Sequence, residues 1–243
     1  MSAEKNAAAA GTVICHDAFA AGPVGWVVGK NWPQRDSPDV WHKNFLGHHG
    51  KGLPLAWSAD GGPVHGYGTS SSPWYFDDNH GEFYWFHLVL TLDAPAVEPI
   101  AHHDVRGARI DVALRGRELD RKDCRLFFWL QGIGGDEGYY EEPVHRCWAL
   151  TSVPLEDALD AGGWEHRTFT LPADESRWSN MGLLNGGLIG KIRVIQSLTS
   201  GHGSLTQILN GNLYNMGFIL CGLNPVDLPH GHIDIGEFKL TLA

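Results

Sequence analysis

Three segments in the middle of the chain alternate apolar side chains with polar or aromatic ones at a period of two. They read EFYWFHLVLTL from Glu82, ARIDVALRG from Ala108 and RLFFWLQG from Arg125. Each has one purely apolar face, and the opposite face mixes rings with polar groups. Antiparallel strands that pack one face on a core show this pattern. The chain is therefore expected to be built from β-sheets.

Further segments with strand character are short and separated by turns. They read HRCWALTSV, HRTFTLP, KIRVIQSL, NMGFILCGL and HIDIGEFKLTL. In the last of these, the apolar phase slips by one residue between Ile235 and Phe238, which predicts a β-bulge at Gly236. Helix is expected only in two short segments, PLEDALDAGG and SLTQILN.

The composition agrees with an all-β chain. Among 243 residues there are 31 glycines and 10 tryptophans, and 43% of the residues are hydrophobic, which suits short strands, tight turns and a substantial core. We expect a single β-sandwich domain over residues 1–243, with an N-terminal arm at residues 1–11. Residues 29–80, interrupted by prolines and glycines, are expected to form a long loop region packed over the sandwich.

Charge and cysteine usage exclude several classes of function. The net charge is −10 and no run of Lys or Arg occurs, so a nucleic-acid partner is disfavoured. No segment approaches the ~20 apolar residues of a membrane span, and no signal peptide is recognisable, so we expect a soluble protein. The four cysteines are widely spaced, and we expect them to be reduced and mostly buried.

The mixed faces of the three strands suit carbohydrate. Sugar rings stack their C–H faces on Trp and Tyr, while their hydroxyl groups need fixed donors and acceptors. If the strands pair, they form one ligand-binding face, and the glycine-rich loop after Gln131 delivers more rings to its rim. The candidate ligand-binding residues are Trp85, His87, Arg109, Asp111, Trp129, Gln131, Tyr139, Tyr140 and Glu141.

Trp129 separates two interpretations of this face. We expect Trp129 and Gln131 on an exposed side, because Leu126, Phe128 and Leu130 fill the core side. An exposed, stacking Trp129 predicts that Trp129→Ala weakens binding roughly tenfold to a hundredfold and leaves the fold intact. In the alternative, residues 29–80 cover the ring as part of a second hydrophobic layer. The same substitution then costs about 3–5 kcal/mol of stability.

Three segments resemble jelly-roll β-sandwich carbohydrate-binding modules, within the broader concanavalin A-like group of lectins and glycanases. HDAFAAGPVGW is similar to their first strand. GGWEHRTFTLPADESRW is similar to a strand-turn pattern in which a Trp-led strand ends in Leu-Pro. MGFILCGLNPVDLPHGHIDIGEFKLTL is similar to their closing strand pair. The resemblance implies an antiparallel jelly roll with less than a fifth of its residues in helix. It also implies that VICHDAF pairs with the C-terminal strand, and that the protein binds a glycan or polysaccharide without catalysis.

The resemblance also implies a structural metal ion. In related modules a calcium ion clamps the joined chain ends. Here Asp17 follows the first strand and Asp234 lies in the last, and backbone carbonyls at Gly236 could complete the oxygen shell that calcium prefers. Calcium held by Asp17 and Asp234 is therefore an expectation.

Two alternatives belong to other classes of function. One is a glycoside hydrolase or polysaccharide lyase of the same fold, with Tyr139 or Tyr140, His87 and Arg109 as acid, base and charge neutraliser. The E-x-D-x-x-E strand of jelly-roll glycanases is absent, and RGRELDR matches the R-x-E-x-R strand of the lyases poorly because it lies at a strand end. The other alternative is a structural or virion-surface protein, a homo-oligomer whose aromatic loops form the subunit contacts.

Overall fold

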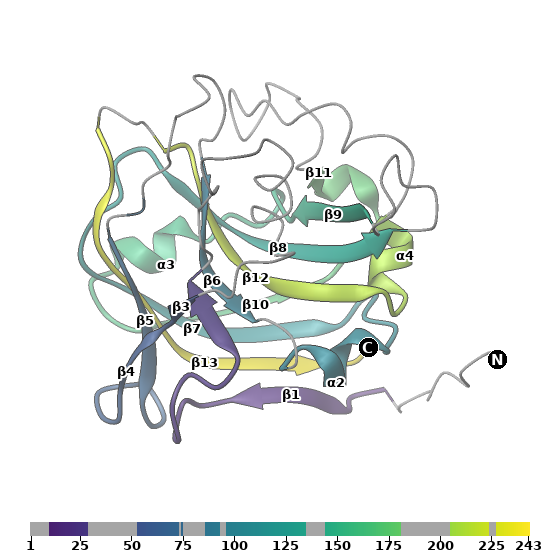
Figure 1. Cartoon of the computed structure of the whole chain (residues 1–243), viewed down its shortest axis with the longest axis horizontal. Helices are drawn as coiled ribbons and strands as arrows, with labels where there is room; N and C mark the ends of the chain where they lie inside the picture. The colour runs from purple at the N-terminus through teal and green to yellow at the C-terminus, as the bar shows by residue number, and fades with distance from the viewer. Residues whose placement is uncertain are drawn as a thin grey trace, which may run out of the picture.

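The computed structural model describes residues 10–28, 53–72, 74, 86–92, 96–134, 144–180, 205–223 and 227–243. These residues form two antiparallel sheets that pack against each other (Figure 1). The predicted all-β sandwich is confirmed.

The six-stranded sheet is centred on the C-terminal strand. Its order is β10–β7–β13–β5–β4, and β1 also pairs with β13. The strands are β1 (Val13–Asp17), β4 (Ala56–Ser58), β5 (Tyr67–Ser71), β7 (Arg109–Asp120), β10 (Glu165–Thr170) and β13 (His230–Thr241). The expected pairing of the terminal strands is confirmed, because β1 runs antiparallel to β13 with Asp17 opposite Phe238 (Figure 1).

The seven-stranded sheet has the order β11–β9–β8–β12–β6–β2–β3. Its strands are β2 (Trp26–Val28), β3 (Leu53–Pro54), β6 (Phe86–Leu92), β8 (Arg125–Gly134), β9 (Val144–Ala149), β11 (Ser179–Asn180) and β12 (Leu213–Cys221). Strand β12 lies between β8 and β6, so these two strands share a neighbour without pairing with each other.

Helices are short in the described part of the chain. They are α2 (Glu98–Ala101), α3 (Glu156–Asp160), α4 (Leu205–Leu209) and the 3-10 turn η1 (Glu175–Arg177). Helices α3 and α4 lie in the two segments predicted to be helical, and Gly162, with φ +73°, follows the end of α3. Within the described ranges, no helix has the length and apolar character needed to cross a membrane.

A chain of aromatic rings joins the two sheets through the core. The ring of Phe238 in β13 lies 5.2 Å from Trp26 and 6.5 Å from Phe218, measured between centroids. Phe218 lies 5.6 Å from Phe128, which in turn lies 5.5 Å from Phe169 of the first sheet. Burial of each such ring contributes about 1.5–3 kcal/mol. These rings therefore fix how one sheet sits on the other.

Residues 53–71 are not the irregular loop that the sequence predicted. They form β3, β4 and β5, and β5 pairs directly with β13. Prolines and glycines interrupt the alternation by which a strand is recognised in the sequence. One of these glycines, Gly68, is needed for close packing. A Cβ on Gly68 would lie 2.7 Å from Cδ1 of Leu55 and 3.1 Å from the ring of Phe19. The predicted strand KIRVIQSL lies outside the described residues.

Two of the described cysteines are fully enclosed by the fold. Cys124 and Cys221 are buried and free, and Cys15 is half-buried and free. Burial raises the pKa of the Cys15 and Cys124 thiols to about 11. Both thiols are therefore protonated near neutral pH, which makes them poor nucleophiles and poor metal ligands.

The β-bulge predicted at Gly236 is confirmed. The register of β13 against β7 shifts between Ile235 and Glu237, and Gly236 is the extra residue. A Cβ at this position would overlap the ring of Pro63 and lie 3.0 Å from Cη2 of Trp164. The bulge therefore needs a residue without a side chain.

We predict that Gly236→Ala lowers the free energy of unfolding by about 1–3 kcal/mol, the usual cost of overpacking, because the added Cβ would overlap the Pro63 ring and crowd Trp164. Urea denaturation measures the change. Gly163→Ala is the matched control, since no atom lies within 4 Å of the Cβ it would add. It should change stability by less than about 0.5 kcal/mol. Equal effects of the two substitutions would contradict the packing argument.

Candidate ligand-binding site

The candidate ligand-binding residues are distributed over both sheets. Arg109 and Asp111 lie in β7 of the six-stranded sheet, whereas Trp129 and Gln131 lie in β8 of the seven-stranded sheet. Strands β7 and β8 are consecutive, but the chain passes from one sheet to the other between Asp120 and Arg125. The expected single face across neighbouring strands is therefore wrong.

The remaining candidates add little to this face. His87 lies in β6, in register with Leu220, and the register of β12 against β6 shifts between Phe218 and Ile219. The uninterrupted alternation predicted for this strand is therefore wrong. His87 and Arg109 also belong to different sheets, so the structure does not bring together the group suggested for a hydrolase or lyase. The candidates that lie outside the described residues are Trp85, Tyr139, Tyr140 and Glu141.

Trp129 and Gln131 are buried, contrary to expectation. Each is only 1% exposed. They lie on the sheet face turned away from the inter-sheet core, because Phe128 and Leu130, which alternate with them, belong to that core. The predicted face is therefore correct, and the predicted exposure is wrong. Periodicity reports which face a side chain occupies but not what covers that face.

The outer face of the seven-stranded sheet carries a row of neutral polar groups. Trp129 is in register with Gly217, and Gly217 is in register with Thr91 on the next strand. One step along, Gln131 is opposite Asn215, and the Asn215 Nδ2 donates a hydrogen bond of 2.9 Å to Gln131 Oε1. We call these five residues the Trp129 row.

Two polar atoms of the Trp129 row are buried without a hydrogen-bond partner. They are the indole Nε1 of Trp129 and the hydroxyl Oγ1 of Thr91, and they flank Gly217 from its two neighbouring strands. An unsatisfied buried polar group costs about 1–3 kcal/mol, so native proteins rarely keep one without a reason. Five such atoms occur among the described residues, and these two share one row.

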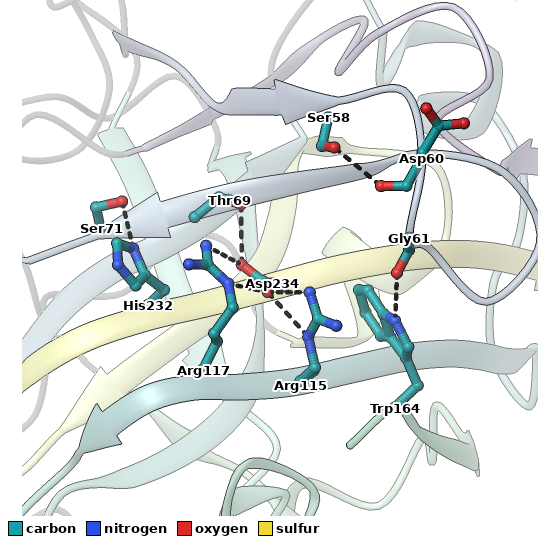
Figure 2. A network of polar contacts seen from close by, with 10 residues as sticks. All are labelled: Ser58, Asp60, Gly61, Thr69, Ser71, Arg115, Arg117, Trp164, His232 and Asp234. Carbon is teal, nitrogen blue, oxygen red and sulfur yellow. Dashed lines mark hydrogen bonds and ion pairs between the residues drawn. The ribbon is translucent and has the colours of Figure 1, made fainter. Parts of the chain in front are cut away.

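The outer face of the six-stranded sheet carries a charged network (Figure 2). Asp234, which is 0% exposed, accepts hydrogen bonds at Oδ2 from Arg115 Nη2 (2.7 Å) and Nε (3.0 Å) and from Arg117 Nε (3.1 Å). Thr69 Oγ1 donates to Oδ1 at 2.9 Å. We call these four residues the Asp234 network. Burial of this carboxylate is tolerated because two cations and a hydroxyl replace its water.

Aromatic rings hold one arginine of the Asp234 network in place. The guanidinium carbon of Arg115 lies 4.4 Å from the ring centroid of Trp164 and 5.0 Å from that of Tyr67, within the range of cation–π attraction. Trp164 is itself fixed, because its Nε1 donates to the Gly61 carbonyl at 2.8 Å (Figure 2). Arg115 is therefore held by its carboxylate partner and by both rings.

The two arginines of the Asp234 network were detectable as a pattern. In RIDVALRGR, the side chains of Arg109, Asp111, Arg115 and Arg117 share one phase of the strand. The second half of this segment was expected to be a strand end, whereas β7 continues to Asp120. That Asp234 would be their partner was not visible, because it lies more than one hundred residues away.

The residues expected to hold calcium do not fit that role. Both oxygens of Asp234 are engaged, and two guanidinium groups would repel a cation there. Asp17 is opposite Phe238, four residues beyond Asp234, and its Oδ1 accepts the Phe19 N–H at 2.7 Å. Burial raises the pKa of the Asp17 carboxyl, while its hydrogen bond from the Phe19 N–H acts in the opposite direction. Across the described ranges, no group of three or more potential metal ligands occurs.

Comparisons with known proteins identify no family. No protein-family model matches the chain, and no curated protein matches it. Among solved structures, a carbohydrate-binding module described as "Solution structure, dynamics and binding studies of CtCBM11" is 10% identical. The match covers 98% of each chain with a TM-score of 0.44. Similarity this low carries no argument about a ligand, so the functional argument depends on the residues themselves.

We predict that Trp129→Ala costs about 3–5 kcal/mol of unfolding free energy, as expected when a fully buried tryptophan is replaced by a cavity. Trp57→Ala is the control. Trp57 is 43% exposed, and its Nε1 donates a single hydrogen bond of 2.8 Å to the Phe19 carbonyl. Trp57→Ala should lower the unfolding free energy by only about 1 kcal/mol. Chemical denaturation compares the two. A loss at position 129 no larger than at position 57 would contradict the burial of Trp129.

Proposed function

We propose that the protein binds neutral carbohydrate without cleaving it, on the outer face of the seven-stranded sheet at the Trp129 row. The observation that carries this proposal is the pair of buried, unpartnered atoms, Trp129 Nε1 and Thr91 Oγ1. A ligand with hydrogen-bonding groups at this point would offset the cost of burying these two atoms without partners.

The chemistry of the row favours a sugar over other ligands. The indole nitrogen can only donate a hydrogen bond, whereas a threonine hydroxyl can donate and accept, and a sugar hydroxyl complements both. Next to them, the Gln131 and Asn215 amides bond to each other and keep this part of the face polar and uncharged. The Trp129 ring is buried, so its contribution to this proposal is the indole N–H and not a stacking surface. None of these five residues carries a charge, which matches a neutral sugar.

The same composition favours binding over catalysis. Glycoside cleavage generally needs a pair of carboxyl groups, one of which donates a proton. The Trp129 row as defined contains no titratable side chain. The row is also closed to solvent, so a sugar reaches it only after a conformational change that exposes these residues. Self-assembly, as in a virion-surface protein, stays a prediction from tryptophan content.

A buried water molecule is the competing explanation for the two unpartnered atoms. Water can satisfy both groups where the space between them is polar and large enough. The two explanations differ in what removal of one atom does. Loss of a water-bridged hydroxyl affects stability alone, whereas loss of a ligand-binding hydroxyl also affects affinity.

We predict that Thr91→Val raises the unfolding free energy by about 1 kcal/mol, because it removes a buried polar group that lacks a partner. It should also weaken binding of a neutral oligosaccharide about three- to tenfold, the value of one hydrogen bond. A glycan array identifies the oligosaccharide. Calorimetry then gives its affinity, and urea denaturation gives the stability.

The matched control is Thr69→Val, the same exchange on the opposite sheet. Thr69 Oγ1 donates to the Asp234 carboxylate, so its loss should cost about 1.5–3 kcal/mol and leave neutral-sugar affinity unchanged. If Thr91→Val also destabilises the protein and does not change affinity, the Thr91 hydroxyl is structural and the proposal is wrong.

A further inference from the structure

The Asp234 network holds more positive charge than its own carboxylate neutralises. Two guanidinium groups, from Arg115 and Arg117, share the single carboxylate of Asp234. The three side chains together carry a charge of +1 in a chain whose net charge is −10. Elsewhere on the same sheet the carboxylates match or outnumber the arginines: Arg109 pairs with Asp111 at 3.0 Å, and Arg167 pairs with both Asp157 and Glu165.

The strand register explains why the arginines converge. Asp234 is opposite Arg115 on one side and Thr69 on the other, so these three residues form a row across β7, β13 and β5. The next row contains Arg117, His232 and Ser71, with the His232 Nδ1 2.9 Å from the Ser71 hydroxyl. This row contains no carboxylate, and Arg117 reaches diagonally to Asp234 (Figure 2).

Each guanidinium uses only part of its donor set. Arg115 bonds to Asp234 through Nε and Nη2, and Arg117 does the same, with its Nη2 contact longer at 3.5 Å. Neither Nη1 makes a hydrogen bond to any part of the chain that the structure describes. Each Nη1 carries two N–H donors. The two side chains are 18% and 36% exposed, so solutes can reach them.

These donors are held in place before any ligand arrives. The Asp234 carboxylate fixes both guanidinium groups, and the rings of Trp164 and Tyr67 fix Arg115. Little side-chain entropy is therefore lost when a ligand binds. Planar guanidinium groups with free N–H donors recognise carboxylate and sulfate through charge-assisted hydrogen bonds. Both rings are partly exposed and adjoin the donors, which suits a ligand that carries its anion on an apolar ring.

We propose that Arg115 and Arg117 bind the oxyanion of an acidic saccharide, a carboxylate or a sulfate group, through their Nη1 donors, while Tyr67 and Trp164 contact its sugar ring. The site lies on the six-stranded sheet and is independent of the Trp129 row. Exposed Glu118 adjoins Arg117 and reduces the excess positive charge, so binding should be weak and sensitive to salt.

The test uses calorimetry with three trisaccharides of matched backbone: one of uronic acids, one sulfated and one unsubstituted. At low salt we expect at least one acidic trisaccharide to bind at least tenfold more tightly than the neutral one, and the preference to fall as salt is raised. The tighter of the two acidic probes identifies the natural anion. Equal binding of all three trisaccharides, or no binding, would overturn the proposal.

Two variants test whether the arginines act specifically. Arg117→Gln should weaken acidic binding at least tenfold. Arg109→Gln removes the same charge from an exposed position on the same strand and should change affinity less than twofold. An equal loss in both variants would show general charge attraction and overturn the site.

A third variant separates a loss of binding from a loss of folding. Arg117→Lys keeps a cation beside Asp234 but loses the planar fork, so it should fold and still weaken acidic binding severalfold. Wild-type affinity in this variant would contradict recognition by the guanidinium. Thr91→Val should leave acidic binding unchanged, and Arg117→Gln should leave neutral-sugar binding unchanged. Each of the two proposed sites can therefore be confirmed or contradicted independently of the other.

Discussion

The packing of Phe238 against rings of the opposite sheet is the contact on which the two outer faces depend. This ring lies in β13 and meets Trp26 and Phe218, so it sets the position of one sheet on the other. Both Ile235 and Phe238 point into the core although they are three residues apart, an odd spacing that a regular strand cannot satisfy. The bulge at Gly236 resolves this conflict. As a result, Asp234 turns outward and Phe238 turns inward within one strand.

The two outer faces use opposite strategies for their polar groups. The Asp234 network satisfies a buried charge with two cations and a hydroxyl, and an excess of donors is left at its surface. The Trp129 row is uncharged and includes two atoms that have no partner. Donors in excess favour an anion, whereas neutral unpartnered groups favour hydroxyl-bearing ligands.

Periodicity predicted the outward phase of the site residues, but it did not predict their environment. Alternation in β8 correctly assigned Trp129 and Gln131 to the face opposite Phe128, and the same rule assigned Arg109 and Asp111 to one phase of β7. It could not show that these strands belong to different sheets, because a crossover and a hairpin look alike in one sequence. The unpartnered state of Trp129 Nε1 is equally invisible, since it depends on every atom around the ring.

The sequence by itself determined what depends on local pattern: an antiparallel all-β chain, the bulge at Gly236, the short helices α3 and α4 and, through similarity, the pairing of the terminal strands. Tertiary structure alone decided which strands are neighbours, that residues 53–71 contain three strands, and that Arg115 and Arg117 share Asp234. The physical reason is the range of the interactions. Side-chain phase follows from backbone geometry over a few residues, whereas charge pairing and burial join residues more than one hundred positions apart.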